Sequence, residues 1–374
     1  MTGALLSALL LVSPLAEGPM IPTLAIGSPA PDFDLPGVDD RRHSLKDFTA
    51  AKVLVVVFTA THCPTAQAYE ERIQKLHDDY AGKGVALVAI SPNDPLAVRL
   101  DELGYTDLGD SFDEMKLRAR ERHFTFPYLY DGETEATSRK YGPQATPHAF
   151  VFDEERKLRF AGRIDDGENP TKVKTEDTRN AIEALLAGRP VPVETTKVFG
   201  CSIKWSDKRE SVAEGLKAWA AEAVTLTTVK TTALKELAKN ATDKPRLINA
   251  WATWCGPCVT EFPELVKIHR MYRGRGLEVV TVSADFPDNK ANALKFLTGQ
   301  QASTNNVILD SGDSYGLIDA LDKEWPGALP YTILVAPGGK VLYRSQGAFD
   351  ALKLRKAVVE YFGRYYHSVP GGGQ

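Results

Sequence analysis

Two cysteines with two residues between them stand between a largely apolar run and a predicted helix. The run is Arg246–Trp251, the pair is Cys255 and Cys258, and an apolar stripe predicts the helix over Pro257–Tyr272. A short run of this kind is typical of a strand buried on both faces of a sheet. Proline is tolerated in the first helical turn because its missing N–H has no helical acceptor there. The segment therefore predicts a buried strand of an α/β sheet, followed by a helix whose N-terminus carries the two thiols.

This arrangement suits thiol–disulfide exchange. Two sulfurs at this spacing lie within one helical turn, and the free N–H groups and positive dipole end of the helix favour thiolate over thiol at Cys255. We predict that Cys255 is the exposed attacking thiolate and that Cys258 is the shielded thiol that resolves the mixed disulfide. Half of a zinc site and a static disulfide are the alternatives, although the sequence has no second pair of ligands at zinc spacing.

A similar order of elements occurs earlier in the chain. The apolar run Val53–Phe58 precedes a predicted helix at Pro64–Tyr80, with Cys63 at the junction. A Thr-Pro pair ending at Pro147 precedes a later strand, as the Leu-Pro pair ending at Pro330 does in the second half. Strands that alternate with helices predict an α/β fold, and the repeated order predicts two units of one architecture.

We predict two domains and a connecting segment from this organisation. A chain of 374 residues is long enough for two separate cores. Residues 187–196 are rich in proline and small residues, which is typical of a linker. The predicted boundaries are 26–187 for the first domain, 188–223 for a linker and helix, and 224–365 for the second domain.

Residues 1–16 are predicted to be a signal peptide. The apolar run Ala4–Val12 suits the core of such a peptide and is too short to span a bilayer. No Lys or Arg precedes the run and the cleavage pattern is imperfect, so a frayed start or an extra helix is the alternative. A cleaved signal would place the protein in the periplasm or cell envelope, without stable membrane insertion.

Charge and cysteine content limit the partners. The formal net charge is −4 without a long Lys/Arg run, which does not favour nucleic acid or an anionic membrane. Four cysteines are too few for a disulfide-stapled scaffold, so any redox role rests on a few thiols. No pattern predicts a cofactor or a metal site.

The Trp-Ala-Thr-Trp-Cys-Gly-Pro-Cys motif of residues 251–258, followed by Glu261 and Pro263, resembles thioredoxin-like proteins of the TlpA/ResA type. These are extracytoplasmic thiol–disulfide oxidoreductases, and the resemblance covers about residues 224–365. It implies a thioredoxin fold with a central mixed sheet flanked by helices. It also implies a cis bond before Pro330, facing the active-site sulfurs.

The same resemblance assigns a role to Glu261. A carboxylate at this position takes the proton from Cys258, provided that its pKa is raised. A solvated helix residue is the alternative, since Glu is normally exposed. Asn249 stands where thioredoxin itself has a buried Asp.

The first unit carries Phe-Thr-Ala-Thr-His-Cys-Pro-Thr over residues 58–65 and Thr-Pro-His-Ala-Phe-Val-Phe-Asp over 146–153. Together they resemble a peroxiredoxin-like redoxin domain of the alkyl hydroperoxide reductase/thiol-specific antioxidant family. The helix N-terminus would activate Cys63. Peroxiredoxins carry a Pro and a Thr where this chain has Val56 and Ala60, which puts peroxidase activity in doubt.

Cys201 is the natural candidate to pair with Cys63, because it follows the first unit directly. The sequence leaves open whether the two thiols meet, and a buried, inert cysteine is the alternative for each. His62 adjoins Cys63, but adjacent side chains usually point apart, so we do not expect it to act on the thiol.

Two enzymatic hypotheses follow. The first is a thiol–disulfide oxidoreductase that exchanges electrons between Cys255–Cys258 and protein disulfides or dithiols, re-reduced by an electron donor of the cell envelope. The second is a peroxide-reducing fusion in which Cys63 is oxidised and the second domain is the built-in reductant. In a third, non-enzymatic hypothesis the first unit is a binding module with an inert thiol.

Overall fold

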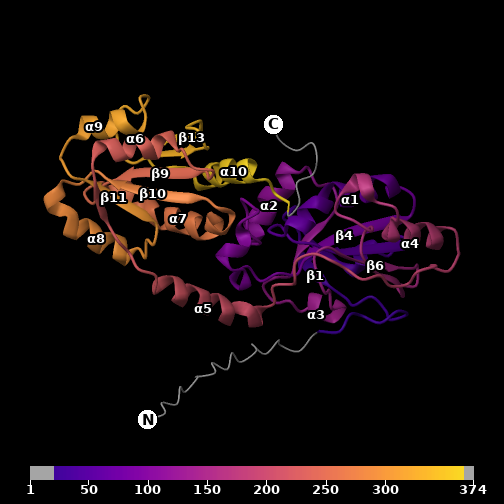
Figure 1. Ribbon diagram of the computed structural model, residues 1–374. Coiled ribbons are helices and arrows are strands. Elements are labelled where there is room, and N and C mark those ends of the chain that lie inside the picture. The colour runs from indigo at the N-terminus through magenta and orange to yellow at the C-terminus, as the bar shows by residue number, and fades with distance from the viewer. Residues whose placement is uncertain (1–20, 366–374) are drawn as a thin grey trace, which may run out of the picture.

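The computed structural model describes residues 21–365. The predicted signal peptide therefore lies outside the described residues. Figure 1 shows two α/β units, one indigo to magenta and the other orange to yellow, joined through helix α5 (Arg209–Ala220). In each unit helices cover a central mixed sheet, as the sequence predicts.

The first domain is built on a sheet whose central strand leads to Cys63. Within the described residues, its order is β5-β4-β3-β6-β7. The first three of these strands are parallel, while β6 and β7 are antiparallel to their neighbours. The strands are β3 (Val53–Phe58), β4 (Val85–Ser91), β5 (Tyr128–Tyr130), β6 (His148–Phe152) and β7 (Leu158–Gly162), and a separate hairpin pairs β1 (Asp34–Pro36) with β2 (Arg42–Ser44).

Alternation along β3 divides the first core into two layers. One face of the strand packs under apolar residues of α1 and α4, and the other packs against Phe33, Leu35 and Tyr141. Side chains of a strand point to opposite faces in turn, so a strand that is apolar throughout is buried on both. The helices are α1 (Pro64–Tyr80), α2 (Phe112–Glu121), α3 (Ser138–Tyr141) and α4 (Asp177–Leu186).

The second domain repeats this plan with an additional edge strand. Its described strands have the order β13-β12-β9-β10-β11-β8. The neighbours β9, β10, β11 and β8 are parallel, and β12 and β13 are antiparallel to their neighbours. The strands are β8 (Thr227–Val229), β9 (Arg246–Trp251), β10 (Glu278–Ser283), β11 (Asn305–Leu309), β12 (Tyr331–Val335) and β13 (Val341–Gln346).

Helices cover both faces of the second sheet. Helices α7, α8 and α10 enclose one core, and α6 and α9 enclose the other. Three short elements, β8, α6 and α9, are not among those predicted from the sequence. The helices are α6 (Thr231–Lys239), α7 (Gly256–Tyr272), α8 (Lys290–Gly299), α9 (Ser314–Leu321) and α10 (Ala351–Phe362).

The two sheets place cysteine and proline in the same register. The peptide bonds before Pro147 and Pro330 are both cis. Phe58 pairs with the residue after the first proline, and Ala250 pairs with the residue after the second. Each of these strand residues lies five positions before its cysteine. The cysteine and the cis proline therefore meet at the same sheet edge in both domains.

The segment predicted as a linker is partly attached to the first domain. Thr195 forms a bridge to Ala161, and Cys201 forms one to Thr146. The backbone N–H of Lys204 donates to the Asn93 side chain at 2.9 Å. These contacts extend the first domain's packing beyond residue 187, and the exact domain boundaries stay a prediction.

The two domains also meet directly. The hydroxyl of Tyr272, at the C-terminal end of α7, donates to the backbone oxygen of Thr106 at 2.7 Å. Val98 and Leu103 of the first domain pack into the apolar core around α7. Across residues 21–365, the structure contains no helix with the length and apolar character needed to cross a membrane.

Candidate active site

Cys255 and Cys258 are joined by a disulfide at the start of α7. Cys255 caps the helix, and its sulfur accepts the backbone N–H of Cys258 at 3.3 Å. Cys258 is fully buried, as predicted for the resolving thiol. Cys255 keeps only 6% of its surface, so its predicted exposure is wrong for this oxidised form. The reason is that the disulfide turns its sulfur toward Cys258, while the preceding Trp254 stays exposed.

Glu261 is buried one turn beyond the disulfide. Its Oε1 accepts the Asn249 side-chain amide at 2.9 Å, and its Oε2 accepts the backbone N–H of Phe349 at 2.9 Å. Burial raises the pKa of Glu261 to about 7, although these two hydrogen bonds act in the opposite direction. The alternative of a solvated residue is therefore wrong. Its role toward Cys258 stays a prediction.

Asp285, which is not among the residues predicted from the sequence, supports the segment that leads to Cys255. Its carboxylate accepts the backbone N–H of Thr253 at 3.0 Å and the Thr253 hydroxyl at 2.6 Å. Asp285 follows β10, which is parallel to β9, so the two strands end at the same sheet edge. An Asp just after a buried parallel strand was the available signal.

Cys63 occupies the corresponding position in the first domain. It caps α1, and its sulfur accepts the backbone N–H of Ala66 at 3.3 Å. The Cys63 side chain is fully buried and its Sγ lies 3.4 Å from the backbone oxygen of Thr146, just before the cis proline. Burial alone would raise the pKa of Cys63, but a hydrogen bond with Cys201 and the charge of His62 lower it to about 6.

The structure brings Cys201 to Cys63, which the sequence left open. Thr146 N–H donates to the Cys201 backbone oxygen at 3.0 Å, and Cys201 packs against the small cluster around Cys63. Gly200 has a φ of 139°, and a Cβ there would stand 2.0 Å from the Thr146 oxygen. Only glycine therefore permits this close approach.

His62 forms a buried ion pair with Asp110. The imidazole Nδ1 lies 2.5 Å from Asp110 Oδ2, and Asp110 Oδ1 accepts the backbone N–H groups of Thr61 and His62. Although burial opposes it, the Asp110 carboxylate raises the pKa of His62. The imidazole is directed at Asp110, as expected for a side chain that points away from its neighbour, yet the charge of His62 is one of the causes that lower the pKa of Cys63, which the sequence did not lead us to expect. Asp110 lies in a loop far along the chain, so no local pattern marked it.

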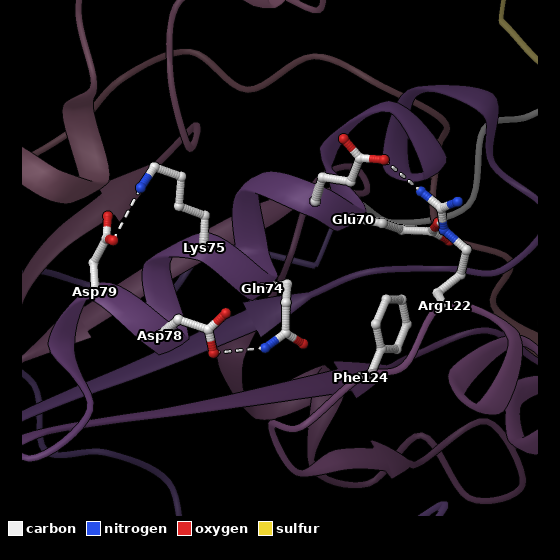
Figure 2. Close-up of a pocket in the computed structure, with 8 residues that line it drawn as sticks. Glu70, Gln74, Lys75, Asp78, Asp79, Arg122 and Phe124 are labelled. Atoms are coloured by element: carbon white, nitrogen blue, oxygen red, sulfur yellow. Dashed lines mark hydrogen bonds and ion pairs between the residues drawn. The ribbon is translucent and has the colours of Figure 1, made fainter.

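A pocket of about 250 Å³ lies elsewhere, along the outer side of α1. Figure 2 shows that its charged side chains pair with one another, as Lys75 does with Asp79 and Arg122 with Glu70. Its lining contains no cysteine. In the described part of the chain, no cluster of three His, Cys, Asp or Glu side chains is placed to hold a metal ion. The thiol sites therefore remain the candidates for chemistry.

Comparison with known families matches both halves of the chain. A sequence model described as the AhpC/TSA family matches residues 26–161 and again residues 214–344. The chain is 30% identical over 108 residues to the thiol-disulfide oxidoreductase ResA of Bacillus anthracis, covering 28% of this chain and 56% of that protein. It is 32% identical over 95 residues to ResA of Bacillus subtilis, covering 25% and 49%. The chain thus spans about half the length of the curated relatives it matches.

Solved structures also resemble parts of the chain. One is a hypothetical protein of Sinorhizobium meliloti, with 32% identity, coverage of 50% of this chain and 97% of that one, and a TM-score of 0.44. Another is a thiol:disulfide interchange protein of the thioredoxin family from Chlorobium tepidum, with 17% identity, coverage of 44% and 99%, and a TM-score of 0.32.

Proposed function

The chain belongs to the AhpC/TSA family, and on that premise we propose that it is a thiol–disulfide oxidoreductase whose working dithiol is Cys255–Cys258. The observation that carries the proposal is the disulfide at the N-terminus of α7, in which Cys258 is fully buried and Cys255 is 6% exposed beside the exposed Trp254. The likeness of the chain to ResA proteins supports the same activity. Its substrates are protein disulfides or dithiols.

The reduction of a substrate begins at Cys255. Its thiolate attacks one sulfur of the substrate disulfide, a bond forms between the two sulfurs, and the other substrate sulfur leaves as a thiolate that takes a proton. Cys258 then loses its proton and attacks the Cys255 sulfur. The second substrate sulfur leaves, and the Cys255–Cys258 disulfide forms. The substrate gains two electrons and the enzyme loses two.

Glu261 is the group that takes the proton from Cys258. A carboxyl group with a pKa of about 7 exists in both protonation states near neutral pH, which suits a group that must accept and return a proton. The hydrogen bonds from Asn249 and Phe349 hold the Glu261 carboxylate in place in the buried interior next to α7. Pro330, in its cis form, presents the neighbouring backbone to the substrate strand.

The proposed setting is the cell envelope. It rests on the predicted signal peptide at residues 1–16 and on the resemblance to extracytoplasmic proteins. An electron donor of the envelope returns the oxidised pair to the dithiol by the reverse exchange.

Reduction of insulin disulfides with a small dithiol as electron source tests the proposal. Cys255→Ser should abolish the activity, and Cys63→Ser, at the matching position of the first domain, should retain it. Equal activity of the Cys255→Ser variant and the unaltered protein would overturn the assignment of the dithiol.

A second candidate function is peroxide reduction at Cys63. Its low pKa and its contact with Cys201 favour it. The Cys63 thiolate attacks a hydroperoxide to give a sulfenic acid and an alcohol, or water from hydrogen peroxide. The Cys201 thiol then displaces water to give a Cys63–Cys201 disulfide, which a dithiol reduces. The full burial of Cys63 and the Val56 and Ala60 substitutions oppose it.

The distance between the two thiol sites also limits how the second domain could supply electrons to Cys63. Helix α7 has 17 residues, a length of about 25 Å, and its C-terminal Tyr272 contacts the first domain. The dithiol lies at the opposite end. Reduction of a Cys63–Cys201 disulfide in this arrangement would therefore use another copy of the chain or an external dithiol. Peroxide consumption that requires Cys63 would establish this function, and its absence would leave the first domain as a binding module.

A further inference from the structure

Three large, exposed aromatic side chains follow the strands whose carboxyl ends share the sheet edge of the dithiol. The exposed fractions are 67% for Trp254, 68% for Phe286 and 84% for Tyr315. They follow β9, β10 and β11, which are adjacent parallel strands. The carboxyl ends of parallel strands lie at one sheet edge, so the three rings occupy the same edge as Cys255. We name Trp254, Phe286 and Tyr315 the aromatic rim.

The loop that carries Phe286 is fastened to the approach to Cys255. Asp285, its neighbour, accepts the backbone N–H of Thr253 at 3.0 Å, as described above. The Asn289 amide donates to Asp285 Oδ1 at 2.9 Å and to the Thr253 hydroxyl at 3.0 Å. This network is buried or half-buried, and it presents Phe286 beside the segment that ends in Trp254.

The loop that precedes α9 lies against Phe286, and Tyr315 stands in the first turn of that helix. A Cβ on Gly312 would stand 2.8 Å from two ring carbons of Phe286, so the absence of a side chain there allows the contact. The rim thus spans the loop of Phe286 and the start of α9, and hydrogen bonds of Asp285 and Asn289 join the Phe286 loop to Thr253, two residues before Cys255. Exposed aromatic groups of this size commonly mark sites that bind another molecule.

The same loops are acidic. Residues 284–289 and 310–316 contain four Asp and no Lys or Arg. Of these, Asp288, Asp310 and Asp313 are exposed, while Asp285 is buried in the network described above. An apolar surface edged by negative charge favours a partner that is apolar and positively charged.

We propose that the aromatic rim docks a polypeptide in which apolar and basic residues flank the cysteine that exchanges with Cys255. This deepens the proposed function and rests on it, because it names the substrate class of the same site. The apolar residues of the partner pack on Phe286 and Tyr315, and its basic residues face the carboxylates at the edge.

The test compares two peptides and two variants. Each peptide carries one cysteine in a mixed disulfide with the same small thiol; in one peptide Phe and Lys flank the cysteine, and in the other Ser and Glu do so. Rates are divided by the rate for a small symmetrical disulfide. The unaltered protein should prefer the first peptide by about tenfold or more in kcat/KM, the scale expected from one well-placed aromatic contact. Added salt should reduce that preference.

Phe286→Ala combined with Tyr315→Ala should remove most of the preference. Tyr361→Ala is the matched control, because Tyr361 is 39% exposed on α10 and outside the rim, and it should keep the preference. Equal rates with the two peptides in the unaltered protein, or a full preference in the double variant, would overturn the proposal.

Peptide binding separates this proposal from the proposed function. A Phe/Lys peptide with Ser in place of Cys cannot exchange, so its affinity, measured by calorimetry, reports docking alone. Tight binding that the double variant loses supports docking at the aromatic rim even if no disulfide is exchanged. Disulfide exchange without such binding overturns the docking proposal and leaves the proposed function in place. Self-association of the protein that the double variant abolishes would assign the face to a second copy and would also overturn the proposal.

Discussion

The two cysteine sites share a backbone and differ in the side chains around it. Cys63 and Cys255 both cap the helix that follows a central strand, and both face a cis proline in the same register. Three residues later the first site has Ala66 and the second has Cys258. The first thiol is therefore activated by groups from elsewhere in the chain, whereas the second has its exchange partner within its own helix.

Supporting residues differ at matching positions too. Six residues after the cysteine stand Tyr69 in one site and Glu261 in the other. The Tyr69 hydroxyl donates to Asp165 at 2.7 Å, a structural contact, while the Glu261 carboxyl has a pKa of about 7. The shared fold therefore supplies a helix N-terminus and a cis proline at both sites. A few side chains around each cysteine determine which chemistry that site can perform.

The largest expected effect is on the free energy of unfolding, and it compares the carboxylates that support the two sites, Asp110 and Asp285. Asp110→Asn should lower the free energy of unfolding by about 3–5 kcal/mol, because it breaks a buried ion pair with His62. Asp285 supports Thr253 and has no ionic partner within residues 21–365, so Asp285→Asn should cost about 1–2 kcal/mol. Urea unfolding measures both. Equal losses would mean that the ion pair does not distinguish the sites.

The second effect is the part of the pH dependence of stability that arises from Glu261 in the second site. The pKa of Glu261 is about 7 in the folded protein against an ordinary 4.5, so the native state binds the extra proton between these values. Stability should therefore fall as pH rises from 5 to 8. Relative to Glu261→Gln, the unaltered protein should lose about 1–2 kcal/mol over this range, less than full burial would give because the carboxyl keeps some solvation. Parallel curves in urea unfolding would contradict this.

The third effect concerns the thiol of the first site. Cys201→Ala removes a hydrogen bond that lowers the pKa of Cys63, which should rise from about 6 toward the ordinary value of about 8.5. Ultraviolet absorbance of the thiolate measures it while Cys255 and Cys258 remain oxidised. Ser202→Ala changes an exposed neighbour and is the control. An unchanged midpoint would show that Cys201 does not contribute to the low pKa of Cys63.

The smallest effect tests whether the two sites are independent. Tyr272→Phe removes the hydrogen bond to Thr106 between the domains and should cost about 1 kcal/mol in calorimetry. It should leave the pKa of Cys63 and the exchange rate at Cys255 unchanged. Tyr141→Phe, which removes a 3.0 Å bond to the backbone oxygen of Pro31 inside the first domain, is the matched control. A change at either thiol would show that the sites are coupled through the interface.

Local patterns in the sequence were sufficient to predict the strand and the helix that flank the cysteine in both sites. The strands before Cys63 and Cys255 and the helices after them were predicted within about one residue, since apolar runs and helix-start residues act over a few positions. The tandem α/β organisation followed from their order. The roles of Cys255, Cys258, Glu261, Pro330 and Cys63 stay predictions.

Tertiary structure decided which distant groups reach the thiols. Cys201 meets Cys63 across 138 positions only because Gly200 can approach Thr146, and Asp110 reaches His62 from a separate loop. The burial that raises the pKa of Glu261 likewise depends on segments that pack over α7. Such contacts depend on how the sheet brings remote loops to one edge, and no short-range periodicity encodes that.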